Sequence, residues 1–184
     1  SEKKLIALIE SELIGIRDKY GEPRRTKISE EDGTPRIIEE APPAEEAAII
    51  LEGQYIRRLS GAAYAKLSNE ELSAMDGASV LHTMTDRKLN LFTSLGNMFS
   101  IDVSAVPEPK PKSKGALLNS LVAGFGDGEG VVAMYSFTEA DVDVLLNFYT
   151  KRGMIKRSTV AEYLVRKQRI AACGLREGDS LLFA

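Results

Sequence analysis

The chain has 184 residues, of which 43% are hydrophobic and 28% charged, and its formal net charge at neutral pH is −3. This composition argues against a disordered chain, and the length suits one domain, or one domain with an appendage. No apolar run approaches the ~20 residues that span a bilayer. The only cysteine is Cys173 and the only histidine is His82, which excludes a disulfide within the chain and a zinc site of several such ligands. We therefore expect a cytoplasmic protein with no cofactor of its own.

The first residues are predicted to form a helix over 2–20. Apolar side chains recur there every three or four positions and form one stripe, made by Leu5, Ile9, Leu13, Ile16 and Tyr20. Gly21 and Pro23 end the helix. Because no capping region precedes it, we expect the sequence to begin inside a longer helix. Residues 29–46 are acidic and rich in proline, and we interpret them as a linker with a short extended piece at 35–38.

From residue 47 onward the pattern is that of short β-strands, so the fold class is predicted to be mainly β. Runs of Val, Ile, Leu, Phe and Tyr alternate with glycines and polar clusters. The predicted strands are 47–51, 55–59, 89–93, 98–103, 131–137, 142–149, 154–157, 170–172 and 180–183. Residues 60–75 are predicted to hold a short helix or a long loop, and residues 107–115 a stiff, extended, basic connector.

Three segments share one hairpin-like pattern, in which an apolar strand, a turn glycine and a return strand follow one another. Their turn glycines are Gly53, Gly96 and Gly153. The glycines lie roughly 40–60 residues apart, a spacing typical of the blades of a propeller-like array. The first and third segments also share a pair of bases after the glycine and a tyrosine, Tyr64 or Tyr163, about ten residues further on.

Charge is distributed unevenly along this acidic chain. Residues 145–169 contain Glu162 as their only acid against seven bases. Such a run is either a solvated face or a cationic binding surface. On the return strand of a hairpin, successive side chains point to opposite faces, so one of each basic pair should face outward. If the units stack, those bases would line a rim that meets DNA phosphates.

A series of motifs carries a specific resemblance. A helix-end motif at residues 19–26 is followed by a Gly-x-Tyr-Ile-Arg-Arg hairpin at 53–58, a threonine-containing strand at 82–87, and further segments at 91–99, 151–157 and 175–179. In this order the motifs resemble the C-terminal part of the A subunit of bacterial type IIA DNA topoisomerases, DNA gyrase and topoisomerase IV. The resemblance implies the end of a coiled-coil helix over 1–28, an acidic linker over 29–46, and a partial β-pinwheel of about two blades over 47–184.

The resemblance also implies a function. It implies a DNA-binding module without catalytic residues, whose partners are double-stranded DNA and the B subunit, with ATP and magnesium used by the whole enzyme through that partner. It implies a bacterial, cytoplasmic and nucleoid-associated protein that has no contact with a membrane. The predicted DNA-binding residues are Arg57, Arg58, Lys151, Arg152, Lys156, Arg157, Arg166, Lys167 and Arg169.

One departure from the family bears on the activity. Gyrases carry a box rich in Gln, Arg and Gly after the first hairpin, where this chain has three acids and no arginine in residues 66–77. This difference favours relaxation or decatenation, as in topoisomerase IV, over supercoiling. An alternative interpretation is a β-propeller-like module that binds proteins.

Two smaller features are open to more than one interpretation. The glycine-rich residues 125–130 are interpreted as a flexible turn, and the alternative is a loose cation site at Asp127 and Glu129. His82 is expected to be a strand residue, and Cys173 a small core residue.

Overall fold

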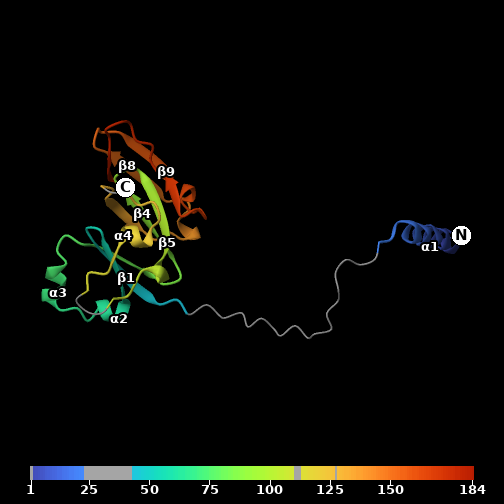
Figure 1. Cartoon of the computed structure of the whole chain (residues 1–184), viewed down its shortest axis with the longest axis horizontal. Coiled ribbons are helices and arrows are strands. Elements are labelled where there is room, and N and C mark those ends of the chain that lie inside the picture. The colour runs from blue at the N-terminus through green and yellow to red at the C-terminus, as the bar shows by residue number, and fades with distance from the viewer. Residues whose placement is uncertain (1, 23–42, 110–112, 127) are drawn as a thin grey trace. The chain divides into compact units, whose positions relative to one another are not determined.

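The computed structural model describes residues 2–22, 43–109, 113–126 and 128–184. The chain divides into two compact units, Ser1–Ala41 and Pro42–Ala184 (Figure 1). The described part of the first unit is helix α1 (Glu2–Tyr20), which confirms the predicted helix, and none of its residues is buried. The coiled-coil pairing of its apolar stripe stays a prediction. The extended piece expected at 35–38 and most of the expected linker lie outside the described residues.

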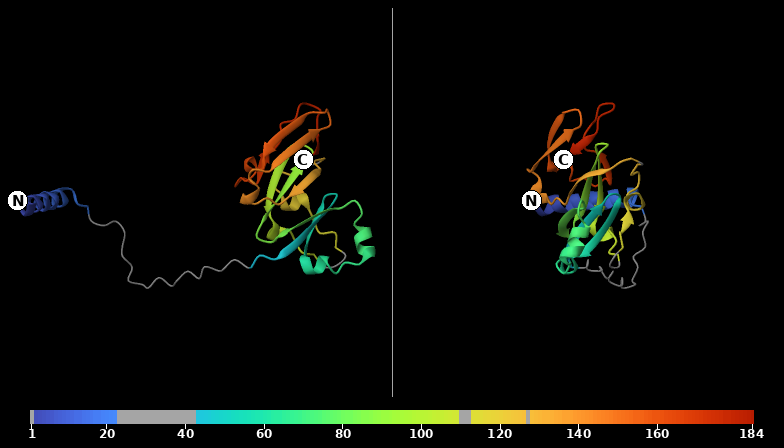
Figure 2. Two further views of the ribbon diagram at one scale, coloured as in Figure 1. Left: turned by 180° about the vertical axis from the view of Figure 1, so that it is seen from behind. Right: turned by 90° about the vertical axis from the view of Figure 1, so that its left-hand side faces the viewer.

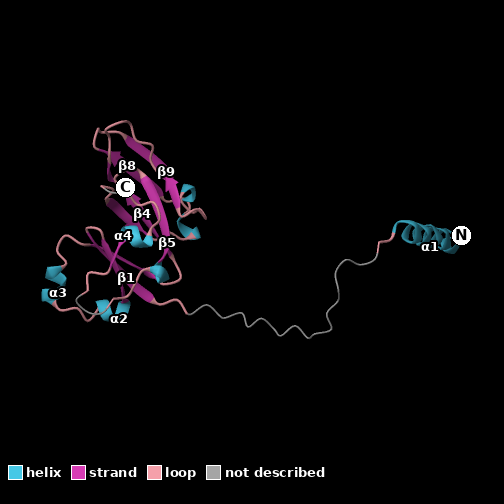
Figure 3. Cartoon of the chain, in the orientation of Figure 1, coloured by secondary structure: helices cyan, strands magenta, loops and turns pink. Residues whose placement is uncertain are grey.

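The second unit consists mainly of antiparallel strands, as predicted (Figure 3). Its strands are β1 (Glu46–Glu52), β2 (Tyr55–Ser60), β3 (Ser79–Met84), β4 (Lys88–Thr93), β5 (Asn97–Asp102), β6 (Ala116–Leu117), β7 (Val131–Tyr135), β8 (Leu145–Thr150), β9 (Ile155–Thr159), β10 (Arg169–Ala171) and β11 (Leu181–Phe183). Its short α-helices are α2 (Gly61–Tyr64), α3 (Asn69–Ala74) and α4 (Leu118–Leu121), and its 3-10 turns are η1 (Val103–Ala105), η2 (Glu139–Asp141) and η3 (Val160–Glu162).

Local chemistry explains where the strand prediction was incomplete. The strand expected over 142–149 begins only at Leu145, because η2 ends at Asp141 and a turn at 142–143 follows it. Residues 60–75 contain α2 and α3, and α3 starts at a capping box. There the Ser68 hydroxyl accepts from the Glu71 amide at 3.2 Å, and the Glu71 carboxylate accepts from the Ser68 amide at 2.9 Å.

All three predicted hairpins are present; the first two are the centre of a sheet, and the third lies at one edge of its sheet. The strand orders are β3-β1-β2-β6, β10-β5-β4-β7 and β11-β8-β9. After the second hairpin the chain first adds β6 to the preceding sheet and only then adds β7 to its own sheet. After the third hairpin it repeats this route with β10 and β11. Consecutive sheets therefore exchange strands.

The three hairpins share one register. The turn glycines Gly53, Gly96 and Gly153 have φ values of 62°, 75° and 77°, in the left-handed region that glycine adopts without steric cost. Counted from the turn, equivalent cross-strand pairs are Ile49 with Arg58, Asn90 with Ser100, and Asn147 with Arg157. A single helical turn (α2, η1 or η3) follows each return strand. Residues can therefore be compared position by position between units.

Two apolar cores lie between the three sheets. The first contains Ile49 and Ile56 of the first sheet with Leu91 and Phe99 of the second. The second contains Phe92 and Met98 from the other face of the second sheet, packed against the third sheet. In Figures 1 and 2 the green strands of the second sheet lie between the cyan strands of the first and the orange strands of the third. The second sheet is thus buried on both faces.

Candidate nucleic-acid interface

The turn of the third hairpin presents two exposed bases, Lys151 and Arg152. The Asp179 carboxylate orders this turn by accepting from the Arg152 amide at 3.0 Å and from the Ser180 amide at 2.9 Å. Loss of hydration raises the pKa of Asp179, but hydrogen bonds from Thr150 and these two amides outweigh it and hold the pKa below its usual value. The guanidinium of Arg152 also donates to the Glu177 carbonyl at 3.1 Å. The turn therefore holds its cations in a defined position.

The two bases of β9 point to opposite faces. Lys156 faces the second core, where its ammonium donates to the Ala172 carbonyl at 2.7 Å and lies 5.6 Å from the Phe148 ring centroid. It also donates to the Tyr163 hydroxyl at 3.3 Å. Arg157 is exposed on the other face, and its Nε donates to the Asn147 side chain at 2.8 Å. Lys156 thus has a structural task inside the module.

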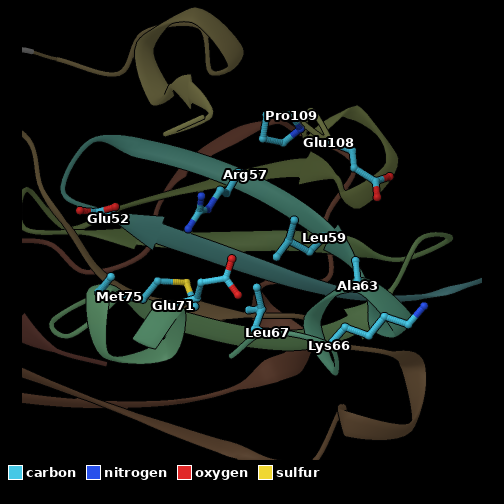
Figure 4. Close-up of a pocket in the computed structure, with 11 residues that line it drawn as sticks. Glu52, Arg57, Leu59, Ala63, Lys66, Leu67, Glu71, Met75, Glu108 and Pro109 are labelled. Atoms are coloured by element: carbon cyan, nitrogen blue, oxygen red, sulfur yellow. The ribbon is translucent and has the colours of Figure 1, made fainter. Parts of the chain in front are cut away.

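The bases of the first hairpin also lie on opposite faces. Arg58 shares a face with Ile56; its side chain is 20% exposed and its guanidinium lies 3.6 Å from the Glu108 carboxylate. Arg57 donates to the Ser113 carbonyl at 2.9 Å and lines a cavity of about 560 Å³ under α2 and α3 (Figure 4). Both side chains contact the segment that leads to β6. The predicted connector, where described, is therefore held against β2.

The remaining predicted bases lie between η3 and β10. Arg166 and Lys167 are exposed in the loop. Arg169 begins β10, and its guanidinium lies 5.5 Å from the centroid of the Phe99 ring. The loop bases and the turn bases thus lie beyond opposite ends of β9.

The expected rim is interrupted in the middle unit. At the register positions of the two basic pairs, the second hairpin carries Phe99 and Ser100, which are both buried. Equivalent bases therefore occur on the first and third hairpins but not on the second. Among the predicted bases, those that are exposed lie on the third unit and its loop.

Glu129 has a role that the sequence did not indicate. Its side chain is only 2% exposed, and the carboxylate accepts from the Thr93 hydroxyl, the Asn97 amide group at 2.8 Å and the Gly126 amide at 3.1 Å. Burial raises the pKa of Glu129, but these bonds and the charge of Arg169 outweigh burial and leave the pKa below its usual value. Glu129 is thus a buried, satisfied carboxylate that ties the glycine-rich segment to the second hairpin, while Asp127 lies outside the described residues. No local pattern signals this pairing.

The described residues contain neither a cluster of metal ligands nor a membrane-spanning helix. Within the described ranges, no group of three or more His, Cys, Asp or Glu side chains could hold a metal ion. None of the helices that the structure describes is long and apolar enough to cross a membrane.

Stacked sheets joined by exchanged strands, with a helix preceding them, define a partial β-pinwheel. No family model matches the chain. The chain is 32% identical to the A subunit of DNA gyrase from Lawsonia intracellularis, over 98% of this chain and 23% of that protein. It is 26% identical to the A subunit of DNA topoisomerase 4 from Bacillus subtilis, over 99% of this chain and 23% of that protein.

A solved structure has the same fold. The crystal structure of the C-terminal domain of DNA topoisomerase IV matches with a TM-score of 0.62 at 18% identity, over 77% of this chain and 46% of that one. The chain is therefore homologous to the C-terminal region of the A subunits of DNA gyrase and topoisomerase IV. It spans less than a quarter of the length of the Lawsonia and Bacillus relatives.

Proposed function

We propose that the chain is a DNA-binding module of a type IIA topoisomerase A subunit. The observation that carries this proposal is homology to the gyrase protein along 98% of the chain, together with the exposed cations of the third unit. The module would guide or bend duplex DNA while the rest of the enzyme passes one duplex through another with ATP. It would supply no catalytic residue, and the B subunit would bind the ATP and magnesium. Its place would be the bacterial cytoplasm, at the nucleoid.

The binding mode follows from the chemistry of the exposed bases. Lys and Arg side chains on a turn and a loop meet phosphates, which fix the position of a duplex and carry little sequence information. The proposed contacts are Lys151, Arg152, Arg166 and Lys167. Arg58 and Lys156 are engaged within the module, so they contribute mainly to its stability.

We also propose an activity like that of topoisomerase IV. The support is the segment 66–77, which carries no arginine and includes helix α3 with Glu70 and Glu71 in its first turn. A cationic box for wrapping DNA is therefore lacking at this position. Relaxation and decatenation are accordingly favoured over supercoiling.

Fluorescence anisotropy with a labelled duplex, at about 50 and about 200 mM salt, tests the DNA-binding proposal. Binding should weaken steeply with salt, and the double variant Lys151→Glu with Arg152→Glu should flatten the salt slope by roughly 0.9 for each lost contact. The matched control, Lys3→Glu with Lys4→Glu, changes the net charge equally on exposed positions of α1. Absent or salt-independent binding would refute the proposal and favour the protein-interaction alternative.

A further inference from the structure

The loop between η3 and β10 carries two exposed cations, Arg166 and Lys167, between residues that are anchored on the module. On one side of the cations, Val165 packs against the second core. On the other side, the Ser100 amide donates to the Gln168 carbonyl at 2.8 Å, and β10 begins at the next residue by pairing with β5. The two cations therefore project from a short segment that is tethered at both ends.

Arg169, the first residue of β10, is the cross-strand partner of Phe99 on β5. Side chains at paired positions of an antiparallel ladder lie on the same face of the sheet. The central carbon of the Arg169 guanidinium lies 5.5 Å from the centroid of the Phe99 ring, within the range of a cation–π contact. Phe99 is 0% exposed and belongs to the first core. Val165 and Arg169 thus anchor the loop on cores that lie on opposite faces of the second sheet.

The guanidinium of Arg169 also has neighbours in the glycine-rich segment. Gly124 leaves room for it, because a Cβ at that residue would lie 3.1 Å from Nη1 of Arg169. Burial raises the pKa of Glu129, and three hydrogen bonds together with the charge of Arg169 outweigh burial. Movement of the guanidinium to a phosphate would uncover the Phe99 ring. It would also remove a positive charge from the vicinity of a carboxylate that is 2% exposed.

We propose that Arg169 is a positioning residue for DNA binding, which holds the loop so that Arg166 and Lys167 meet the phosphates of a duplex and does not bind phosphate itself. This role rests on the DNA binding proposed above. Its physical basis is preorganisation, because a loop that is already ordered loses less conformational entropy when it binds. The turn of the third hairpin is ordered in a comparable way, since the Asp179 carboxylate accepts hydrogen bonds from two backbone amides there.

Fluorescence anisotropy with a labelled duplex over a series of salt concentrations separates positioning from contact. In Arg169→Gln, the affinity should fall roughly 3- to 10-fold at every salt concentration, because the loop must then be ordered on binding. The slope of log K against log salt should stay that of the wild type. Arg166→Gln makes the same change of charge and should instead flatten the slope by roughly 0.9. Urea unfolding checks that each variant is folded under the assay conditions, so that lost stability alone cannot lower the affinity.

Gly124→Asn tests the same contact without a change of charge. Asn is among the few residues with a Cβ that adopt a left-handed backbone, such as the φ of 80° at Gly124, and its side chain would occupy the place of the Arg169 guanidinium. We expect weaker binding with an unchanged salt slope. Gly128→Asn is the matched control, because Gly128 also has a φ of 80° and a Cβ there would meet no atom within 4 Å. This control should bind DNA like the wild type.

Hydrogen exchange without DNA follows the loop directly, through the Ser100 amide that donates to Gln168. This amide should exchange faster in Arg169→Gln and Gly124→Asn than in the wild type, and at the wild-type rate in Arg166→Gln. A salt slope flattened by roughly 0.9 in Arg169→Gln would make Arg169 a phosphate contact and overturn the inference. Wild-type affinity in Arg169→Gln would overturn it as well. Absence of DNA binding by the wild type would refute the proposed function, whereas either of the first two results refutes the positioning role alone.

Discussion

Removal of the Glu129 carboxylate is expected to destabilise the second unit markedly. In Glu129→Ala, the Gly126 amide and the Asn97 side chain lose their charged acceptor. The Thr93 hydroxyl retains a second acceptor, the Asn97 carbonyl at 3.4 Å. Hydrogen bonds to a charged group each contribute about 1.5–3 kcal/mol, and water can replace part of the loss at the half-buried Asn97. We therefore expect the free energy of unfolding to fall by about 2–4 kcal/mol at neutral pH.

The pH dependence has a definite sign. Because the pKa of Glu129 is lower in the folded state than in the unfolded chain, its contribution is complete above the unfolded value of about 4.3. The contribution is lost as the pH falls through the folded pKa. The stability difference between wild type and Glu129→Ala should therefore be constant near neutrality and shrink under acid conditions.

Urea unfolding followed by circular dichroism measures this difference at several pH values. Glu129→Gln is the matched control, because it keeps the shape of the side chain but cannot ionise. It should lose part of the stability and show no titration from this site. A cost below about 0.5 kcal/mol for Glu129→Ala, the usual range of a surface substitution, would refute the reasoning. So would a stability difference that grows on acidification.

Three further changes test the packing and capping. Gly96→Ala should lower the free energy of unfolding by more than about 1–2 kcal/mol, which is the cost of a left-handed backbone alone. The extra loss is expected because an added Cβ would lie 2.2 Å from the Cys173 carbonyl oxygen. Gly53→Ala has no atom within 4 Å of its Cβ and, as the control, should cost only the backbone term in thermal unfolding. Phe92→Ala should cost about 3–5 kcal/mol in urea unfolding, since Phe92 is fully buried in the second core; a small loss would contradict the assigned packing. Ser68→Ala should cost about 0.5–2 kcal/mol and speed amide exchange in α3, and unchanged exchange would argue against the capping box.

The hairpins could be predicted because the residues that determine each hairpin are close together in the sequence. Each has two apolar runs flanking a glycine that must take positive φ, so the pattern and the turn chemistry agree. Strand β10 was expected at 170–172, whereas β6 has only two residues and becomes a strand only because an edge of an earlier sheet receives it. The sequence shows three repeated units but not the exchange of strands that joins them.

The sequence likewise showed the cation-rich segment, but it did not show which of the bases are engaged within the fold and which are exposed. Lys156 and Arg157 are neighbours in the chain, yet Lys156 packs against Phe148 and Arg157 is exposed on the opposite face of the sheet. Which side chain is covered depends on the sheet stacked against each face. The partner of Glu129 could not be predicted for a similar reason, since Thr93 lies 36 residues away.

The register shared by the units argues against reading DNA contacts from repeated bases alone. The position of Lys156 is filled by Phe99 in the second unit, so the same position holds a buried ring in one unit and a half-buried amine in another. Strand positions are covered whenever a neighbouring sheet or an added strand is present. Residues in turns and loops take no part in strand pairing in any of the three units. Lys151 and Arg166 are therefore better placed than Lys156 and Arg157 to meet phosphates.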